Sequence, residues 1–164
     1  TNMHDDAIYE KPMTIIKIIL LIIVIGLVIW FMTGVIIKHK EAKIYIKSKT
    51  GVQTFTASIA ETYEARAQGL SGTKYLAPDS ALLMIFPHDD NWGIWMKDMN
   101  YPIDVVWLNS SYEVVHIEQS MHPNSYPRSI YKPKNTARYV IEFPAATTSR
   151  SYLKIGSKVK IDIR

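Results

Sequence analysis

The residues most able to do chemistry lie in one apolar stretch, 92–108, which reads WGIWMKDMNYPIDVVWL. It holds three of the chain's four tryptophans, and Lys97, Asp98 and Asp104 stand among these large side chains. Charged groups are almost never fully buried unless they are paired. The stretch therefore predicts either a fixed ion pair or a site that uses these charges.

Asp104 is the most constrained of the three because it lies inside a short apolar strand, 103–108. Alternation along a strand puts Asp104 on one face with Val106 and Leu108, and residues 103, 105 and 107 on the other. An ionised carboxylate there needs a partner, and the candidates are Lys97, Arg66 and Arg138. Two interpretations stay open: an acid–base or ligand-anchoring pair in a cleft, and a buried salt bridge that fixes the strand register. We favour the second.

Other reactive constellations are weaker. His88-Asp89-Asp90 could be part of a metal corner, but adjacent ligands cannot easily all face one ion and no closing pair has metal spacing. Ser71 stands in Gly-Leu-Ser-Gly after an expected helix, which lacks the strand-turn-helix elbow of a nucleophilic serine. The chain has no cysteine, which excludes thiol catalysis and thiolate metal sites. We predict no metal and no cofactor.

A proline-rich loop adds a second candidate surface. Residues 119–136 contain three prolines, and Tyr126 and Arg128 suit recognition of a sugar, glycan or peptide by stacking and forked hydrogen bonds. The alternative is a stiff surface loop with no ligand. The predicted ligand-binding set comprises Arg66, Trp92, Trp95, Lys97, Asp98, Asp104, Tyr126 and Arg128.

The elements that must position these residues are mostly strands. Short β-branched or apolar runs recur between turn signals, as in 52–60, 81–86, 103–108 and 137–143. A short strand is also expected at 94–97, and one brief helix over 61–68, capped by Thr62 and ended by Gly69. We therefore predict a mainly β domain, a β-sandwich or open barrel of jelly-roll type with one or two short helices.

The N-terminal part reads differently. Residues 18–37 form 20 successive uncharged positions, about the length that crosses a hydrocarbon core of roughly 30 Å. We expect a polar tail (1–12), a transmembrane anchor (13–37), a basic juxtamembrane linker that includes a possible first strand (38–49) and a β domain (50–164). A cleaved signal peptide fits less well, because no small-residue cleavage pattern follows.

Charge constrains partners only loosely. The formal net charge is +4, and no basic stripe is interleaved with aromatic residues, so nucleic acid is not an expected partner. The lysines at 38, 40, 43, 47 and 49 would place the domain in the cytoplasm by the positive-inside rule. A large C-terminal domain can, however, be translocated against flanking charge.

The order of several motifs resembles a known family. Arg66-x-x-Gly-Leu-Ser-Gly is followed by Trp95-Met-Lys-Asp-Met with Pro-Ile-Asp, and then by Ala137-Arg-Tyr-Val-Ile-Glu. Over about 50–163 this resembles the bacterial and archaeal domain-of-unknown-function family one-nine-two. The resemblance implies a compact mainly β fold and frequent export, and no established activity. The chain departs at Ala81 and Ala146, where the family usually has glycine, and at Asp98, where asparagine is common.

Three functions follow from these features. The first is a membrane-anchored binding or accessory module at the cell envelope, for a small polar or carbohydrate-like ligand. The second is an envelope hydrolase or lyase that uses Lys97 with Asp98 or Asp104. The third is a structural domain that binds another envelope protein. Aromatic density without a triad, metal set or cofactor fingerprint favours the first, and the habit of the family favours an extracytoplasmic domain.

Overall fold

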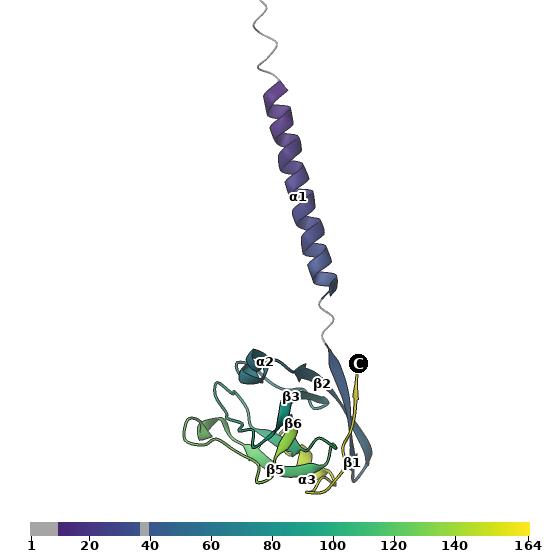
Figure 1. Ribbon diagram of the computed structural model, residues 1–164, viewed down its shortest axis with the longest axis vertical. Helices are drawn as coiled ribbons and strands as arrows, with labels where there is room; N and C mark the ends of the chain where they lie inside the picture. Colours follow the sequence, from purple (N-terminus) through teal and green to yellow (C-terminus); the bar gives the residue numbers. More distant parts are fainter. Residues whose placement is uncertain (1–9, 37–39) are drawn as a thin grey trace, which may run out of the picture. The chain divides into compact units, whose positions relative to one another are not determined.

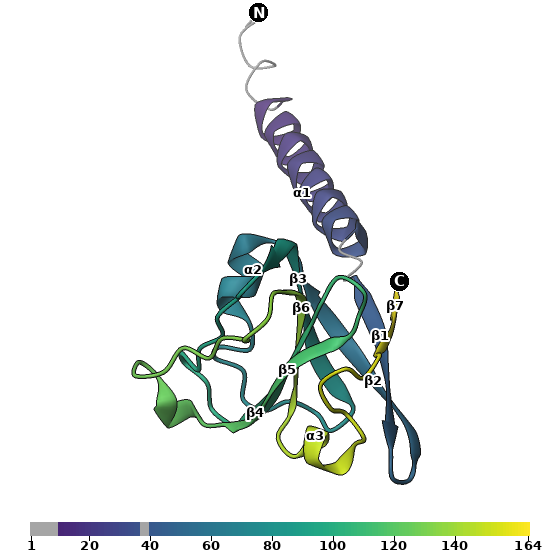
Figure 2. The ribbon, with the colours of Figure 1, turned by 60° about the horizontal axis from the view of Figure 1, so that its bottom comes forward.

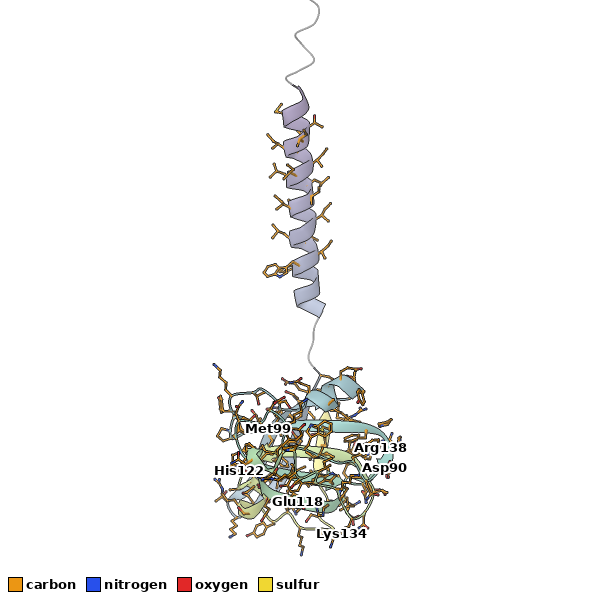
Figure 3. All side chains as sticks on the ribbon, turned by 90° about the vertical axis from the view of Figure 1, so that its left-hand side faces the viewer. Asp90, Met99, Glu118, His122, Lys134 and Arg138 are labelled. Carbon is orange, nitrogen blue, oxygen red and sulfur yellow. The ribbon has the colours of Figure 1, made fainter. Side chains whose placement is uncertain are left out.

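The computed structural model describes residues 10–36 and 40–164, which form two separate compact units. The first is the helix α1 (Glu10–Ile36). The expected tail lies outside the described residues apart from its last three positions, which belong to α1; residues 37–39 lie outside them too. Within α1, Met13–Phe31 is long and apolar enough to cross a membrane, a test that a signal sequence also passes, and its side chains project outward all round (Figure 3).

The second unit contains the strands (Figure 1). Their bounds are β1 (Glu41–Ser48), β2 (Gly51–Ala60), β3 (Ser80–Asp90), β4 (Ile103–Leu108), β5 (Val114–Met121), β6 (Ala137–Pro144) and β7 (Lys160–Ile163). They form one seven-stranded sheet in the order β5-β4-β6-β3-β2-β1-β7. Every neighbouring pair is antiparallel except β2 and β3, which run parallel.

The two ends of this sheet are joined by the segment that precedes β7. The Val114 N–H donates to the Ser157 carbonyl at 2.9 Å, and the Gly156 N–H donates to the Val114 carbonyl at 2.8 Å. The single sheet therefore curls into an open barrel, and its curvature is visible in both views (Figures 1 and 2). The predicted mainly β fold class is confirmed.

The central strands of the sheet, β3, β4 and β6, are largely buried on both faces. Inside the barrel lies a core of residues from all parts of the sheet, including Ile44, Phe55, Leu83, Val106 and Phe143. The outer face of β3, β4 and β6 carries a second core, which includes Leu82, Met84, Ile103, Val105 and Trp107. The predicted alternation along β4 is therefore confirmed. In the described domain the buried residues of both cores lie within 42–159, so we expect fragment 40–164 to fold without α1.

The parallel pair β2–β3 requires a crossover, and the chain makes it through α2 (Tyr63–Gln68). The Thr62 side chain accepts a hydrogen bond from the Ala65 N–H at 3.1 Å, and Gly69 ends the helix at φ 51°. The predicted helix and both of its caps are confirmed. Two further short helices, η1 (Pro123–Ser125) and α3 (Thr147–Arg150), follow β5 and β6. In both views α2 and α3 lie at opposite ends of the sheet (Figure 2).

Two predictions about local structure need correction. The expected strand over 94–97 is absent from the described domain, where Ile94 makes only an isolated bridge to Tyr131. The segment 94–97 covers the outer face of the sheet instead of pairing with another strand, because Ile94 and Met96 are buried in the outer core. The first strand within 38–49 is real, and it belongs to the domain rather than to a linker, since Ala42, Ile44 and Ile46 are part of the barrel core.

Two positions where the chain departs from the family pattern adopt left-handed backbone. Ala146 has φ 65° and Asp98 has φ 55°. Glycine tolerates this region without penalty, which fits the glycine expected from the resemblance at position 146, whereas aspartate, like asparagine, adopts it more readily than most residues. Ala146 therefore stores strain at the start of α3.

Replacing Ala146 with glycine is expected to stabilise the domain. Relief of the left-handed penalty, about 1–2 kcal/mol, outweighs the greater freedom of glycine in the unfolded chain, so the expected gain is about 0.5–1 kcal/mol. Urea denaturation of fragment 40–164 measures it. The matched control is Ala145→Gly, at a position with no positive φ, which should lose stability. Equal effects of both changes would contradict the assignment of strain to Ala146.

Candidate functional site

A pocket of about 260 Å³ opens on the outer face of the sheet. Its walls come from α2, from β3, from the segment 92–99 and from β6. The lining is mostly apolar and aromatic, and the polar and charged exceptions include Arg66 and Glu142. Its members come from four separate parts of the chain, so only the folded sheet assembles them.

Glu142 is the unusual member of this pocket. It lies on β6, paired in register with Leu82 of β3 and Val105 of β4, and its residue exposure is only 3%. Its Oε2 atom is buried and has no hydrogen-bond partner within the described residues. Burial away from water raises the pKa of the Glu142 carboxyl to about 8. At neutral pH this side chain is therefore mainly a neutral acid.

Gly69 permits the close approach of α2 to Glu142. A Cβ atom at this position would lie 3.2 Å from the Met84 Cε atom and 3.9 Å from the Glu142 Oε2 atom. The residue also has the positive φ that ends α2. A side chain here would therefore crowd the pocket floor as well as strain the turn.

Aromatic rings form another part of the pocket lining. Phe86 and Trp92 are stacked, with ring centroids 4.4 Å apart. The indole N–H of Trp92 donates to the His88 carbonyl at 3.0 Å, and that of Trp107 donates to the Trp92 carbonyl at 2.9 Å. These bonds hold the Trp92 ring and backbone, whereas Trp95 is 43% exposed. The wall is thus rigid inside and open at Trp95.

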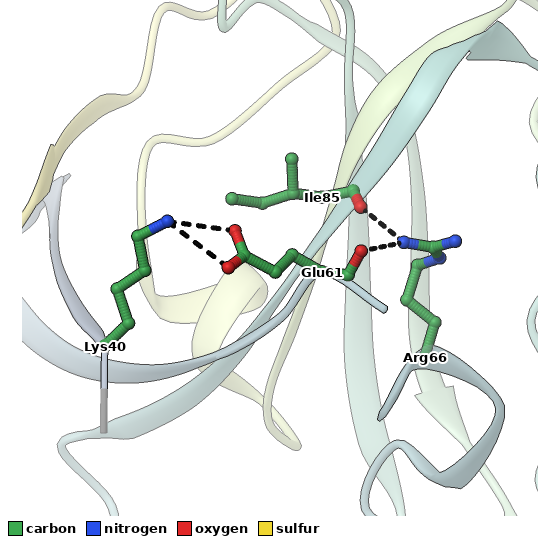
Figure 4. Close-up of polar contacts among 4 residues, drawn as sticks. All are labelled: Lys40, Glu61, Arg66 and Ile85. Carbon is green, nitrogen blue, oxygen red and sulfur yellow. Dashed lines mark hydrogen bonds and ion pairs between the residues drawn. The ribbon is translucent and has the colours of Figure 1, made fainter. Parts of the chain in front are cut away.

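Arg66 is held by the backbone around it (Figure 4). Its Nη1 atom donates to the Glu61 carbonyl at 2.6 Å and to the Ile85 carbonyl at 2.9 Å, and its guanidinium lies 5.0 Å from the centre of the Phe86 ring. The Glu61 carboxylate forms an ion pair with Lys40, at 3.0 Å. The Arg66 charge therefore has no carboxylate partner among residues 40–164.

Asp104 lies on the neighbouring strand, one register position from Glu142, and is buried on the opposite face of the sheet. Its partners differ from those expected. Its Oδ1 accepts from the Ser120 and Ala146 N–H groups at 2.9 and 3.2 Å. Its Oδ2 accepts from the N–H and the hydroxyl of Thr148 at 2.8 and 2.7 Å. These groups, rather than Lys97, Arg66 or Arg138, satisfy the carboxylate, because β5 and α3 bring unpaired donors to it. Asp104 ties three elements together and is closed to a ligand.

The remaining predicted residues do not line the pocket. Lys97 and Asp98 are exposed, and their backbone carbonyls accept from the Ser71 hydroxyl and the Gly72 N–H. Tyr126 and Arg128 lie in a turn of the proline-rich loop, where the Arg128 guanidinium donates to the Asn124 backbone carbonyl at 3.2 Å. Arg138 lies 4.0 Å from Asp89, next to Asp90 (Figure 3). Of the predicted set, the pocket brings together Arg66, Trp92 and Trp95.

Sequence reasoning missed Glu142. The available signal was the same one that singled out Asp104, a carboxylate inside an apolar alternating strand, here 139–143. Neither strand pattern indicates which of the two carboxylates accepts hydrogen bonds from neighbouring groups and which one lines a pocket. That difference comes from the covers, α3 over one acid and α2 over the other.

The fold and the pocket together define the class of protein: a small open-barrel domain with a pocket on the outer face of the barrel sheet. Residues 44–161 match the domain-of-unknown-function family DUF192, described as Uncharacterized ACR. The chain belongs to this family, as the order of its motifs predicts.

Relatives and solved structures agree with this assignment. A UPF0127 protein of Thermococcus sibiricus is 33% identical over 119 residues, covering 71% of this chain and 73% of the relative. Another, of Pyrococcus horikoshii, is 35% identical over 104 residues, 62% of this chain and 84% of the relative. A crystal structure from Sinorhizobium meliloti, with the provisional description of transcription regulator, has TM-score 0.67 and 25% identity, over 74% of this chain and 92% of that one. A protein of unknown function from Novosphingobium aromaticivorans has TM-score 0.66 and 20% identity, over 72% and 83%.

Truncating Asp104 is expected to be strongly destabilising. Asp104→Ala leaves three N–H groups and a hydroxyl without their acceptor, so we expect a loss of at least about 3 kcal/mol of unfolding free energy. Chemical denaturation measures the loss, and the exposed Asp98→Asn is the control, with little change expected. A small effect of Asp104→Ala would contradict the structural role.

Glu142 makes stability depend on pH with a definite sign. Below about pH 4.5 both states hold the proton; between pH 4.5 and 8 the unfolded chain ionises while the folded domain keeps it, so the free energy of unfolding falls as pH rises. Glu142→Gln removes this loss and is expected to stabilise the domain by about 3 kcal/mol at pH 7 and little at pH 4. Urea denaturation at both pH values tests it, with the exposed Glu41→Gln as control. A gain of equal size at pH 4 and pH 7 would refute the linkage.

Proposed function

We propose that the domain binds a small, mainly apolar ligand in the pocket lined by Arg66, Phe86, Trp92 and Glu142. One observation carries the proposal: the apolar pocket contains a buried carboxyl group with an oxygen that has no partner in the described chain. Buried polar side-chain atoms are nearly always hydrogen-bonded in folded proteins. A ligand that supplies the missing bond would bind with orientation as well as hydrophobic contact.

The lining determines the kind of ligand. Stacked Phe86 and Trp92 and the exposed ring of Trp95 offer wide apolar contact, with Met84 and Met99 completing the walls. Apolar cavities of about 150 Å³ hold a benzene ring, so 260 Å³ suits a ring with a short substituent. This favours an amphipathic molecule over the polar or carbohydrate-like ligand expected from the sequence.

We further propose that residues 13–37 anchor the protein in a lipid bilayer and that the domain works at the cell envelope on the extracytoplasmic side. The length and composition of α1 support the anchor. The export habit implied by the family resemblance supports the side, and the lysines after the helix argue against it. An envelope protein is a second kind of partner that this location would allow.

The catalytic alternative has no comparable support. It requires Lys97 to act with Asp98 or Asp104. The Asp104 carboxylate, however, accepts all four of its hydrogen bonds from Ser120, Ala146 and Thr148, and none from Lys97. Lys97 and Asp98 do not line the pocket.

Thermal melting of fragment 40–164 with a panel of small molecules tests the binding proposal. Small aromatic alcohols such as 3-phenylpropanol should raise Tm, whereas mono- and disaccharides should not. A ligand at ten times its Kd stabilises by about 1.4 kcal/mol, or roughly 5 °C for a domain of this size.

A blocked pocket provides the control. Ala67 lines the pocket from α2 and is exposed, so Ala67→Trp should fill the mouth without disturbing the core and should abolish the shift. Glu64→Trp places the same ring on α2 at an exposed residue that does not line the pocket, and it should preserve the shift. Binding that survives Ala67→Trp unchanged, or the absence of any apolar hit, would refute the proposed function.

A further inference from the structure

Resting on the proposed pocket, we propose that its ligand is a small monocarboxylic acid with an apolar body. The ligand carboxylate accepts a hydrogen bond from the Glu142 carboxyl group, and its negative charge lies in the field of Arg66. The apolar body lies against the rings of Phe86 and Trp92.

The surroundings of Glu142 leave it as a donor. Its strand neighbours in register, Leu82 and Val105, are apolar, and the described residues provide no hydrogen-bond partner for Oε2. An acid in such surroundings keeps its proton, in line with a pKa of about 8. A protonated carboxyl group has one O–H to donate, and a carboxylate is the strongest common acceptor for it because the bond is charge-assisted.

Arg66 decides between an anionic and a cationic ligand. Its guanidinium is permanently charged, and only Nη1 is used, by two backbone carbonyls (Figure 4). Nε and Nη2 make no hydrogen bond within residues 40–164. The guanidinium also lies over the Phe86 ring at 5.0 Å, where a ligand ammonium would otherwise gain cation–π attraction. The pocket therefore repels a cation and attracts an anion.

Few other ionisable groups contribute to the charge of the pocket. The pocket residues that titrate or carry charge are Glu142 on β6 and Tyr63 and Arg66 on α2. The lining residues of β3, Met84 and Phe86, have no ionisable group. The segment 92–99 contains Lys97 and Asp98, but both are exposed and neither lines the pocket.

This pairing gives the affinity a characteristic pH dependence. An ordinary carboxylic acid is ionised above about pH 5, and Glu142 holds its proton up to about pH 8. Affinity for a carboxylate is therefore constant between these values and falls tenfold per pH unit above pH 8. A ligand amine would show the opposite trend, binding more tightly as Glu142 ionises.

Calorimetric titration of fragment 40–164 with three probes that share one body tests the inference. The probes are 3-phenylpropionate, 3-phenylpropanol and 3-phenylpropylamine. We expect 3-phenylpropionate to bind at least tenfold more tightly than the alcohol at pH 6.5 and to lose that advantage above pH 8. This measurement uses the wild-type sequence alone, so it does not depend on any variant folding.

Two variants assign the effect to residues. Glu142→Gln keeps an N–H donor at every pH and should make propionate binding independent of pH. Arg66→Met keeps much of the apolar stem and removes the charge, so it should weaken propionate about tenfold more than it weakens the alcohol. Arg128→Met, on the proline-rich loop, is the matched control and should change neither.

Each other outcome has a separate meaning. Equal affinity for all three probes, or tighter amine binding that rises with pH, overturns the carboxylate inference and leaves the proposed apolar site intact. Failure of all three probes, together with failure of every apolar compound in the melting panel, refutes the proposed function itself.

Discussion

The constraint on which this domain depends is that its central strands are buried on both faces. Every residue of β4 is buried, and β6 is buried over most of its length. Strands of this kind read as nearly continuous apolar runs. The barrel provides its own interior, but the outer face of β3, β4 and β6 needs a cover, which α2 and the segments around 92–101 and 131 supply.

Two carboxylates break these apolar strands, and the structure treats them in opposite ways. Asp104 points to the barrel side, where Ser120, Ala146 and Thr148 bring it four hydrogen bonds. Glu142 points to the outer side, where one oxygen has no partner in the described domain. A satisfied buried carboxylate stabilises a fold and an unsatisfied one costs free energy. Asp104 is therefore a structural residue, and Glu142 is the residue on which the proposed binding site rests.

The pocket is a consequence of how the outer cover is built. A crossover between parallel strands brings α2 over the sheet, and Gly69 lets its end approach Met84 and Glu142. The segment 92–99 packs against the same face through Ile94 and Met96 without forming a strand. The cover is therefore made of two pieces that meet around Glu142 rather than of one continuous layer.

Much of the architecture was determined by local sequence. Alternation along 103–108 fixed which side chains face which core, the Thr62 and Gly69 signals fixed α2, and the apolar run before residue 37 fixed α1, because each depends on neighbours within a few positions. The tertiary structure alone decided the partners of Asp104 and the role of Glu142. Asp104 meets Thr148, 44 residues away, and Glu142 meets α2 more than 70 residues before it in the chain. Spacing cannot encode such contacts, since whether a buried acid finds donors or a pocket depends on which cover the fold lays over it.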